Sequence, residues 1–239
     1  MTMYIALEGI KGSGKSTLFT RLQAAMRARG IDFASLCPTR PRTDFAPLDW
    51  LYSRTGNCWP DWATEQIYAR RARHHVAAAL SRRAPLILGE RSLFTSYVTR
   101  WDHAAPERGM RRVRQLEHSS PVPDHVLYLA LPVALACQRI AHRSARHYGT
   151  HDQKNERLHE ADALYRQLAR CADKWGLGAT KWHWLDATQD IEQLLEQAME
   201  IICSLGAACP GAPSIAAPSA APHARFCIQP LLHDSRHCA

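Results

Sequence analysis

Near its start the chain carries the stretch Gly9-Ile10-Lys11-Gly12-Ser13-Gly14-Lys15-Ser16, followed by Thr17. This stretch matches the phosphate-binding pattern G-x4-G-K-[S/T], and its surroundings meet the structural requirement of that pattern. The apolar run Met3–Glu8 ahead of it predicts a buried strand, and apolar residues recur at helical spacing from Lys15 to Arg29. A strand, a glycine-rich turn and a helix N-terminus together make a cradle for a polyphosphate.

The residue types in this stretch suit that task. Glycines at positions 9, 12 and 14 let the backbone wrap an anion closely, with successive amide N–H groups pointing inward. Lys15 would contact the β- and γ-phosphates, and the Ser16 hydroxyl would ligate Mg²⁺. We therefore expect the whole stretch to bind a nucleoside triphosphate.

The composition is that of a globular protein and excludes several other classes. The chain has 239 residues, 46% of them apolar, 12 glycines and a formal charge of +8, so wholesale disorder and collagen-like repetition are excluded. It has no apolar run long enough to span a membrane, and Glu8 interrupts the N-terminus, so we expect neither a membrane segment nor a signal peptide. Eight cysteines without a CxxC pair predict mostly reduced thiols and a cytoplasmic location.

Strands and helices alternate along the rest of the chain. Further strands are predicted over 31–37, 85–89, 125–131 and 180–185, and helices over 62–83, from about 132, and over 191–202. This alternation favours an α/β fold whose parallel sheet is covered on both faces and binds ligands at the carboxyl ends of its strands. We expect one domain over 1–205 and a disordered Ala/Pro-rich tail over 206–239.

Two further groups of residues suit phosphate chemistry. The third strand runs into Glu90-Arg91, where a carboxylate could hold Mg²⁺ and a guanidinium could bind a phosphate, although a surface ion pair is an alternative. Arg139, Arg143 and Arg146 form one helical stripe that leads into a polar segment. Such a stripe suits a lid over about 143–156 that closes on phosphates, and a solvated helix face is the alternative.

These features together resemble the thymidylate kinases and the related deoxynucleoside kinases over about residues 3–204. Besides the glycine-rich stretch, Glu90-Arg91 stands where thymidylate kinases have an Asp-Arg pair, and residues 67–71 where they have an aromatic-x-Ala-x-Arg helix. Residues 123–129 and 186–192 are similar to later segments of that family. The resemblance implies a P-loop kinase fold: a five-stranded parallel sheet with helices on both faces and a lid.

The resemblance also implies roles for individual residues. Arg71 and Arg91 would hold the acceptor monophosphate or its base, and Arg40 matches a substrate-site arginine of the family. Arg143 and Arg146 would close from the lid and stabilise the transferring phosphoryl group. Ser16 with Glu90 would organise Mg²⁺. A homodimer is implied as well.

The sequence departs from the thymidylate kinase pattern at three positions. Lys11 aligns with an acid that touches the sugar 3′-hydroxyl, Ile67 with a stacking aromatic residue, and Arg100 lies near the usual polar partner of thymine. Deoxynucleoside kinases use an acid after the second strand as general base, and residues 36–44 offer only Asp44 there. A monophosphate acceptor is already ionised and needs no such base, so the pattern favours a monophosphate kinase.

Three functions follow from this comparison. The first is transfer of the γ-phosphoryl group of ATP to a deoxynucleoside monophosphate, with dTMP giving dTDP. The second is a deoxynucleoside kinase that phosphorylates a 5′-hydroxyl, and the third is a P-loop regulator that binds nucleotide without catalysis. His147 and His151 lack the further ligands of a usual metal-binding motif, so we expect no metal ion at this pair. The basic run over 100–114 carries no nucleic-acid-binding motif, so we do not expect nucleic acid as a partner.

Overall fold

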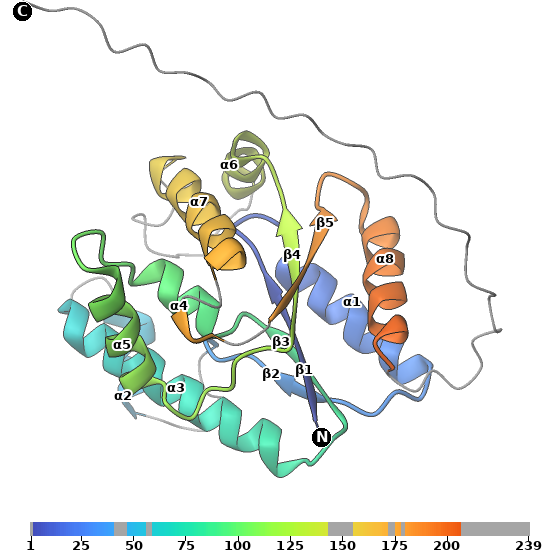
Figure 1. The fold of residues 1–239 in the computed structure, drawn as a ribbon, viewed down its shortest axis with the longest axis horizontal. Coiled ribbons are helices and arrows are strands. Elements are labelled where there is room, and N and C mark those ends of the chain that lie inside the picture. Colours follow the sequence, from blue (N-terminus) through green and yellow to red (C-terminus); the bar gives the residue numbers. More distant parts are fainter. Residues whose placement is uncertain are drawn as a thin grey trace, which may run out of the picture.

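The structure is a computed structural model that describes residues 2–40, 47–55, 59–142, 155–171, 175–177 and 180–206. It contains a five-stranded sheet in the order β2-β3-β1-β4-β5, with every neighbouring pair parallel (Figure 1). The strands are β1 (Met3–Glu8), β2 (Ala34–Leu36), β3 (Leu86–Glu90), β4 (His125–Ala130) and β5 (Lys181–Asp186). The helices are α1 (Lys15–Ala28), α2 (Pro47–Thr55), α3 (Asp61–Ser81), α4 (Leu93–Thr99), α5 (Pro106–Leu116), α6 (Val133–Ala141), α7 (Asn155–Cys171) and α8 (Ile191–Ser204).

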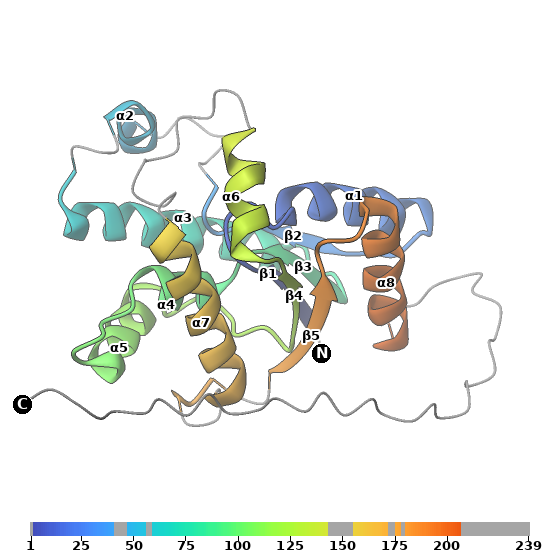
Figure 2. The same ribbon diagram turned by 90° about the horizontal axis from the view of Figure 1, so that it is seen from above.

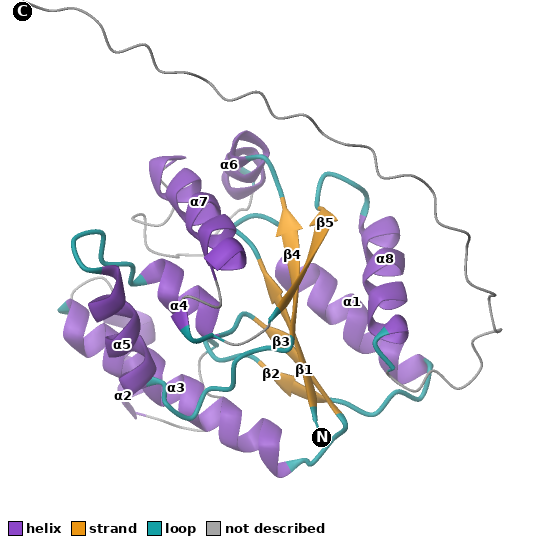
Figure 3. Cartoon of the chain, in the orientation of Figure 1, coloured by secondary structure: helices purple, strands orange, loops and turns teal. Residues whose placement is uncertain are grey.

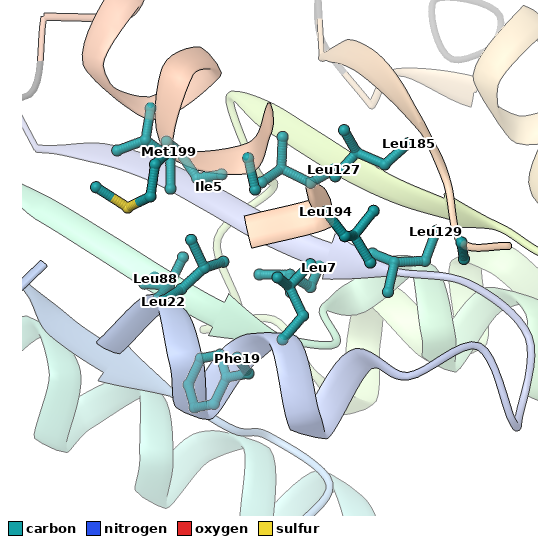
Figure 4. Close-up of a cluster of buried hydrophobic side chains, with 14 of the residues drawn as sticks. Ile5, Leu7, Phe19, Leu22, Leu88, Leu127, Leu129, Leu185, Leu194 and Met199 are labelled. Carbon is teal, nitrogen blue, oxygen red and sulfur yellow. The ribbon is translucent and has the colours of Figure 1, made fainter. Parts of the chain in front are cut away.

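Helices cover both faces of the sheet. Figures 1 and 2 show α1 and α8 on one side and α3, α4, α5 and α7 on the other. Because side chains alternate along a strand, Ile5 and Leu7 of β1 pack in the cluster with α1 and α8, whereas Tyr4 and Ala6 pack toward α3. Figure 4 shows the first of these clusters, in which Phe19 and Leu22 of α1 lie under the strands. The expected α/β architecture with a parallel, doubly covered sheet is confirmed.

The parallel register brings the ends of β1 and β3 together. Leu7 pairs with Glu90, so Glu8 and the glycine-rich stretch emerge beside the end of β3. β4 lies on the other side of β1, where Glu8 pairs with Tyr128. The three central strands therefore end at one edge of the sheet, where ligands of parallel α/β folds collect.

Some element boundaries differ from the sequence prediction. β2 is only Ala34–Leu36 rather than 31–37, because the amide of Ile31 still donates to Met26 O and extends the end of α1. α3 ends at Ser81 because Arg83 adopts a left-handed backbone with φ 51°. α2, α4, α5 and α7 were not predicted, and Figure 3 shows how much helix they add beside the sheet.

The remaining sequence expectations concern the lid, the C-terminal tail, a membrane segment and the cysteines. Residues 143–154, which make up most of the proposed lid, and the tail from 207 onward lie outside the described residues. Among the described residues, none of the helices combines the length and apolar content that a membrane crossing requires. Cys37, Cys137 and Cys171 are free thiols, as expected, whereas Cys203 is disulfide-bonded.

Candidate active site at the ends of β1 and β3

The glycine-rich stretch forms the connection between β1 and α1, with residues 9–14 in the turn and Lys15, Ser16 and Thr17 opening the helix. Gly14 caps α1 in a left-handed conformation with φ 94°, which is costly for a residue with a Cβ. Gly12 has φ 91°, and a Cβ there would lie 2.8 Å from the carbonyl oxygen of Ala136. The glycines thus allow both the turn and its close contact with α6.

Lys15 lies inside the concave side of this turn. Its Nζ donates to the carbonyl oxygens of Gly9 and Ile10, at 2.7 Å each, and to Ser13 Oγ at 3.2 Å. The residue is only 5% exposed. An ammonium group is therefore held at the centre of the loop, where a polyphosphate bound by the loop amides would meet it.

Glu90 joins two of the other predicted site residues. Ser16 Oγ donates to Glu90 Oε1, and Arg40 Nη2 donates to Glu90 Oε2. Glu90 is 6% exposed at the end of β3, while half of the Arg40 side chain is exposed. We call Ser16, Glu90 and Arg40 the phosphate corner. Its hydroxyl and carboxylate oxygens are hard donors of the kind that Mg²⁺ prefers, so the residues present fit this ion.

Arg71 lies in an aromatic setting on α3. Its guanidinium carbon lies 5.3 Å from the ring centroids of both Tyr52 and Tyr68, and the residue is 3% exposed. The Tyr52 ring also packs edge to face on Trp59, with 5.9 Å between centroids. We call Tyr52, Tyr68 and Arg71 the aromatic box. Ile67, which aligns with the family's stacking residue, is buried in contrast, so the aromatic surface comes from its neighbour Tyr68 and from α2.

One face of α3 connects the aromatic box to the phosphate corner. Tyr68, Arg71 and His75 are spaced i, i+3 and i+7 and therefore share a face of the helix. His75 Nε2 lies 3.1 Å from the carbonyl oxygen of Arg40 and forms a hydrogen bond with it. Along the helix axis, His75 lies about 6 Å from Arg71 and about 10 Å from Tyr68.

Arg91 follows Glu90 and has an unusual backbone. Its φ is 70°, in the left-handed region, and its amide donates to Leu7 O at 3.0 Å. Its charge acts on Tyr165 of α7: burial raises the pKa of that phenol well above its ordinary value, and the cationic Arg91 partly opposes the rise. Arg91 is half-buried between the ends of β1 and β3.

Sequence reasoning did not single out Glu8, which lies beside the site. This fully buried carboxylate accepts hydrogen bonds from Ser92 Oγ and Thr95 Oγ1 at 2.7 Å and from Tyr165 OH at 2.9 Å. The sequence signal for such a residue is an acid that ends an otherwise apolar strand directly before Gly9.

The remaining predicted arginines have other partners or lie outside the described residues. Arg100 pairs at 2.9 Å with Glu117, a buried carboxylate whose pKa is raised by its burial. Arg139 donates to the carbonyl oxygen of Ala187 at 3.0 Å. Arg143 and Arg146 lie outside the described residues. The structure therefore brings Lys15, the phosphate corner and Arg91 to the ends of β1 and β3.

A parallel sheet with a glycine-rich turn between β1 and α1, and a lysine held inside that turn, defines a P-loop nucleotide-binding protein. The family model described as thymidylate kinase matches residues 7–198. This chain therefore belongs to the thymidylate kinase family, as the sequence resemblance predicted.

Individual relatives agree with this family assignment. The probable thymidylate kinase 1 of Saccharolobus solfataricus is 26% identical, over 84% of this chain and 97% of its own. The thymidylate kinase of Mycobacterium tuberculosis is 26% identical, over 80% and 93%. That of Xanthomonas oryzae pv. oryzae is 29% identical, over 84% and 82%. The chain is an ATP-dependent phosphotransferase, and its family uses ATP and a nucleoside monophosphate as substrates.

Proposed function

We propose that this enzyme transfers the γ-phosphoryl group of ATP to dTMP and forms dTDP. The observation that carries the proposal is the arrangement along α3, where one helix face joins the phosphate corner to the aromatic box through the hydrogen bond of His75 with Arg40. The Arg40 guanidinium of the corner and the aromatic box, about 6 to 10 Å apart along α3, suit a ligand with a phosphate at one end and a flat base at the other.

On the donor side, the loop amides and Lys15 would hold the triphosphate. When ATP binds, its phosphate oxygens would replace the carbonyl oxygens of Gly9 and Ile10 as partners of the Lys15 ammonium. Ser16 and Glu90 would hold Mg²⁺. The ion would supply positive charge to the β- and γ-phosphate oxygens. Glu90 is already shared with Arg40, so the corner links donor and acceptor sides.

On the acceptor side, Arg40 and Arg91 would hold the monophosphate, and Arg71 would face the nucleoside. The attacking atom is an oxygen of an ionised phosphate, so no protein group has to remove a proton. The enzyme would contribute by aligning the two anionic groups and by stabilising charge on the transferring phosphoryl group. We propose Arg143 and Arg146 as the lid residues that add to this charge.

We propose that residues 1–205 form the catalytic domain and that 206–239 are dispensable for transfer. A homodimer and a cytoplasmic location likewise stay predictions from the resemblance.

The test is an acceptor screen at fixed ATP and Mg²⁺. Thymidine and dTMP are supplied in parallel, with dUMP, dCMP, dGMP and dAMP as further acceptors, and ADP formation is measured. We expect dTMP to give the highest kcat/KM. A chain that phosphorylates thymidine and leaves dTMP unchanged would be a deoxynucleoside kinase, and preference for another monophosphate would refute the choice of base.

A further inference from the structure

Glu8 is a buried carboxylate that the proposed chemistry does not use. It ends β1 and is fully buried, yet its two oxygens accept from three hydroxyl groups: Ser92 on Oε1, and Thr95 and Tyr165 on Oε2. Burial of an acid is costly unless its oxygens are satisfied. Here Ser92 at the N-cap of α4, Thr95 within α4 and Tyr165 of α7 satisfy them. We call these four residues the Glu8 cluster.

The Glu8 cluster lies directly beside Arg91. Ser92, the next residue, donates to Glu8 Oε1 and also accepts from the amide of Phe94, so it caps α4 at the same time. Arg91 itself has φ 70°, a conformation that disfavours a residue with a Cβ and persists only when its surroundings hold it. On its other side, Glu90 is held by Ser16. The hydrogen bonds of Glu90 and Ser92, the two neighbours of Arg91, therefore fix the backbone from which the Arg91 side chain extends.

The third donor connects the cluster to α7. Tyr165 OH lies 2.9 Å from Glu8 Oε2 and 3.1 Å from Thr95 Oγ1. The charge of Arg91 partly opposes the rise that burial causes in the pKa of this phenol. One buried carboxylate thus joins β1, the turn after β3, α4 and α7, the helix that begins directly after the proposed lid.

We propose that Glu8 is a positioning residue for Arg91: through Ser92, Thr95 and Tyr165 it holds the arginine in the orientation that binds the acceptor phosphate. This inference rests on the proposed role of Arg91 toward the acceptor. It predicts a specific kinetic signature, because the three hydroxyls donate to Glu8, whereas Lys15, the proposed ATP-binding group, donates to Gly9 O, Ile10 O and Ser13 Oγ of the loop.

The experiment measures KM for dTMP at saturating ATP, and KM for ATP at saturating dTMP. Glu8→Gln should raise the KM for dTMP about tenfold or more, since small misplacement of a binding group has large effects on alignment. Tyr165→Phe, which removes only the α7 hydroxyl, should raise it about threefold. Both variants should leave the KM for ATP unchanged, and their effects should be less than additive, because they act through one cluster.

Tyr128→Phe is the matched control. Tyr128 is also buried, its ring lies 5.3 Å from that of Tyr165, and its hydroxyl donates to a carboxylate, Asp162 Oδ1, at 2.6 Å. This substitution removes an equivalent hydrogen bond from the same core and should leave the KM for dTMP unchanged. A Glu8→Gln enzyme with an unchanged KM for dTMP, or with equal rises in both KM values, overturns the inference.

A second readout does not depend on turnover. In protein labelled with ¹⁵N-arginine, the Arg91 Nε–Hε signal is assigned by its loss in Arg91→Lys. Glu8→Gln should shift this signal in the ligand-free protein, and Tyr128→Phe should not; an unshifted signal in Glu8→Gln contradicts the inference. Failure of the proposed function can be distinguished from failure of this inference. In that case the wild-type protein would transfer no phosphoryl group to dTMP, whether or not the Arg91 signal shifts in Glu8→Gln.

Discussion

Lys15 and Glu90 carry the opposite charges at the centre of the candidate site. Lys15 is buried against the loop carbonyls, and Glu90 is buried against Ser16 and Arg40. Groups held in this way lose little freedom when a phosphate or a metal ion arrives, which is the condition for effective charge stabilisation. Each charge should therefore have a separable effect on the reaction.

Replacement of Lys15 by alanine should remove activity and leave the fold intact. The ammonium is the cationic side chain at the centre of the loop, so we expect kcat to fall by at least about 100-fold, as for other lost charge-stabilising donors. Steady-state ADP formation measures the loss, and circular dichroism checks the fold. Near-normal turnover in Lys15→Ala would contradict the donor-side assignment.

Replacement of Glu90 by glutamine should weaken Mg²⁺ use. The amide keeps the size of the side chain and loses the charge that faces Ser16 and Arg40, so the Mg²⁺ concentration for half-maximal rate should rise about tenfold. Glu65→Gln is the control, because Glu65 also pairs with an arginine, Arg112, at 2.6 Å but away from the loop. An unchanged Mg²⁺ dependence in Glu90→Gln would argue against the metal role.

Among the elements, α3 contributes most to the proposed acceptor site, and it does so jointly with α2. The face of α3 that carries Tyr68, Arg71 and His75 follows from helical spacing alone. The aromatic box needs Tyr52, however, and α2 is a helix of nine residues with no strong periodic pattern. The position of Tyr52 against Arg71 arises from packing between the two helices, so the sequence did not predict it.

Removal of the Tyr52 ring should affect the acceptor and not ATP. A base that stacks on an aromatic side chain gains about 1–3 kcal/mol, so Tyr52→Ala should raise the KM for dTMP by roughly 5- to 150-fold. Trp62→Ala is the control, since Trp62 lies at the start of α3 and is 65% exposed. Equal kinetics for the two variants would show that the aromatic box does not contact the acceptor.

Over the whole molecule, the candidate site occupies the carboxyl end of the sheet, and a histidine pair lies at the amino end of β4. His125 Nδ1 and His183 Nε2 are 3.1 Å apart across β4 and β5. Burial lowers the pKa of both imidazoles below the ordinary value of 6.5; His183 and Lys181 lower that of His125 further, and Asp124 opposes this. The pair thus lies at the opposite end of β4 from the candidate site.

The protein should lose stability in mild acid because of this pair. A histidine whose pKa is lower in the folded than in the unfolded state binds protons preferentially when unfolded, so the stability is complete above about pH 6.5 and declines as the pH falls below it. Urea unfolding between pH 7.5 and 5 measures the free energy of unfolding. The double variant His125→Asn, His183→Asn should show a weaker decline, and an identical decline in both proteins would rule out this cause.

Local patterns were sufficient for the phosphate-binding loop and the five strands. The loop's residues are consecutive, and a strand, a glycine turn and a helix N-terminus form from neighbours in the chain, so the motif carries its own geometry. α4 was not predictable in this way, because six of its seven residues are buried and it lacks an amphipathic pattern. The strands could be predicted because each is a short apolar run bounded by turn residues, which is a local pattern.

The contacts that complete the site depend on long-range packing. Glu8 meets Tyr165 across 157 residues, and Arg40 meets Glu90 across 50. No spacing rule links such positions, because their distance depends on the order of strands in the sheet and on how the helices pack against it. The chain's local chemistry therefore identifies the phosphate-binding loop, whereas only the order of the strands and the packing of the helices on the sheet bring Glu90, Arg40 and Arg91 beside that loop.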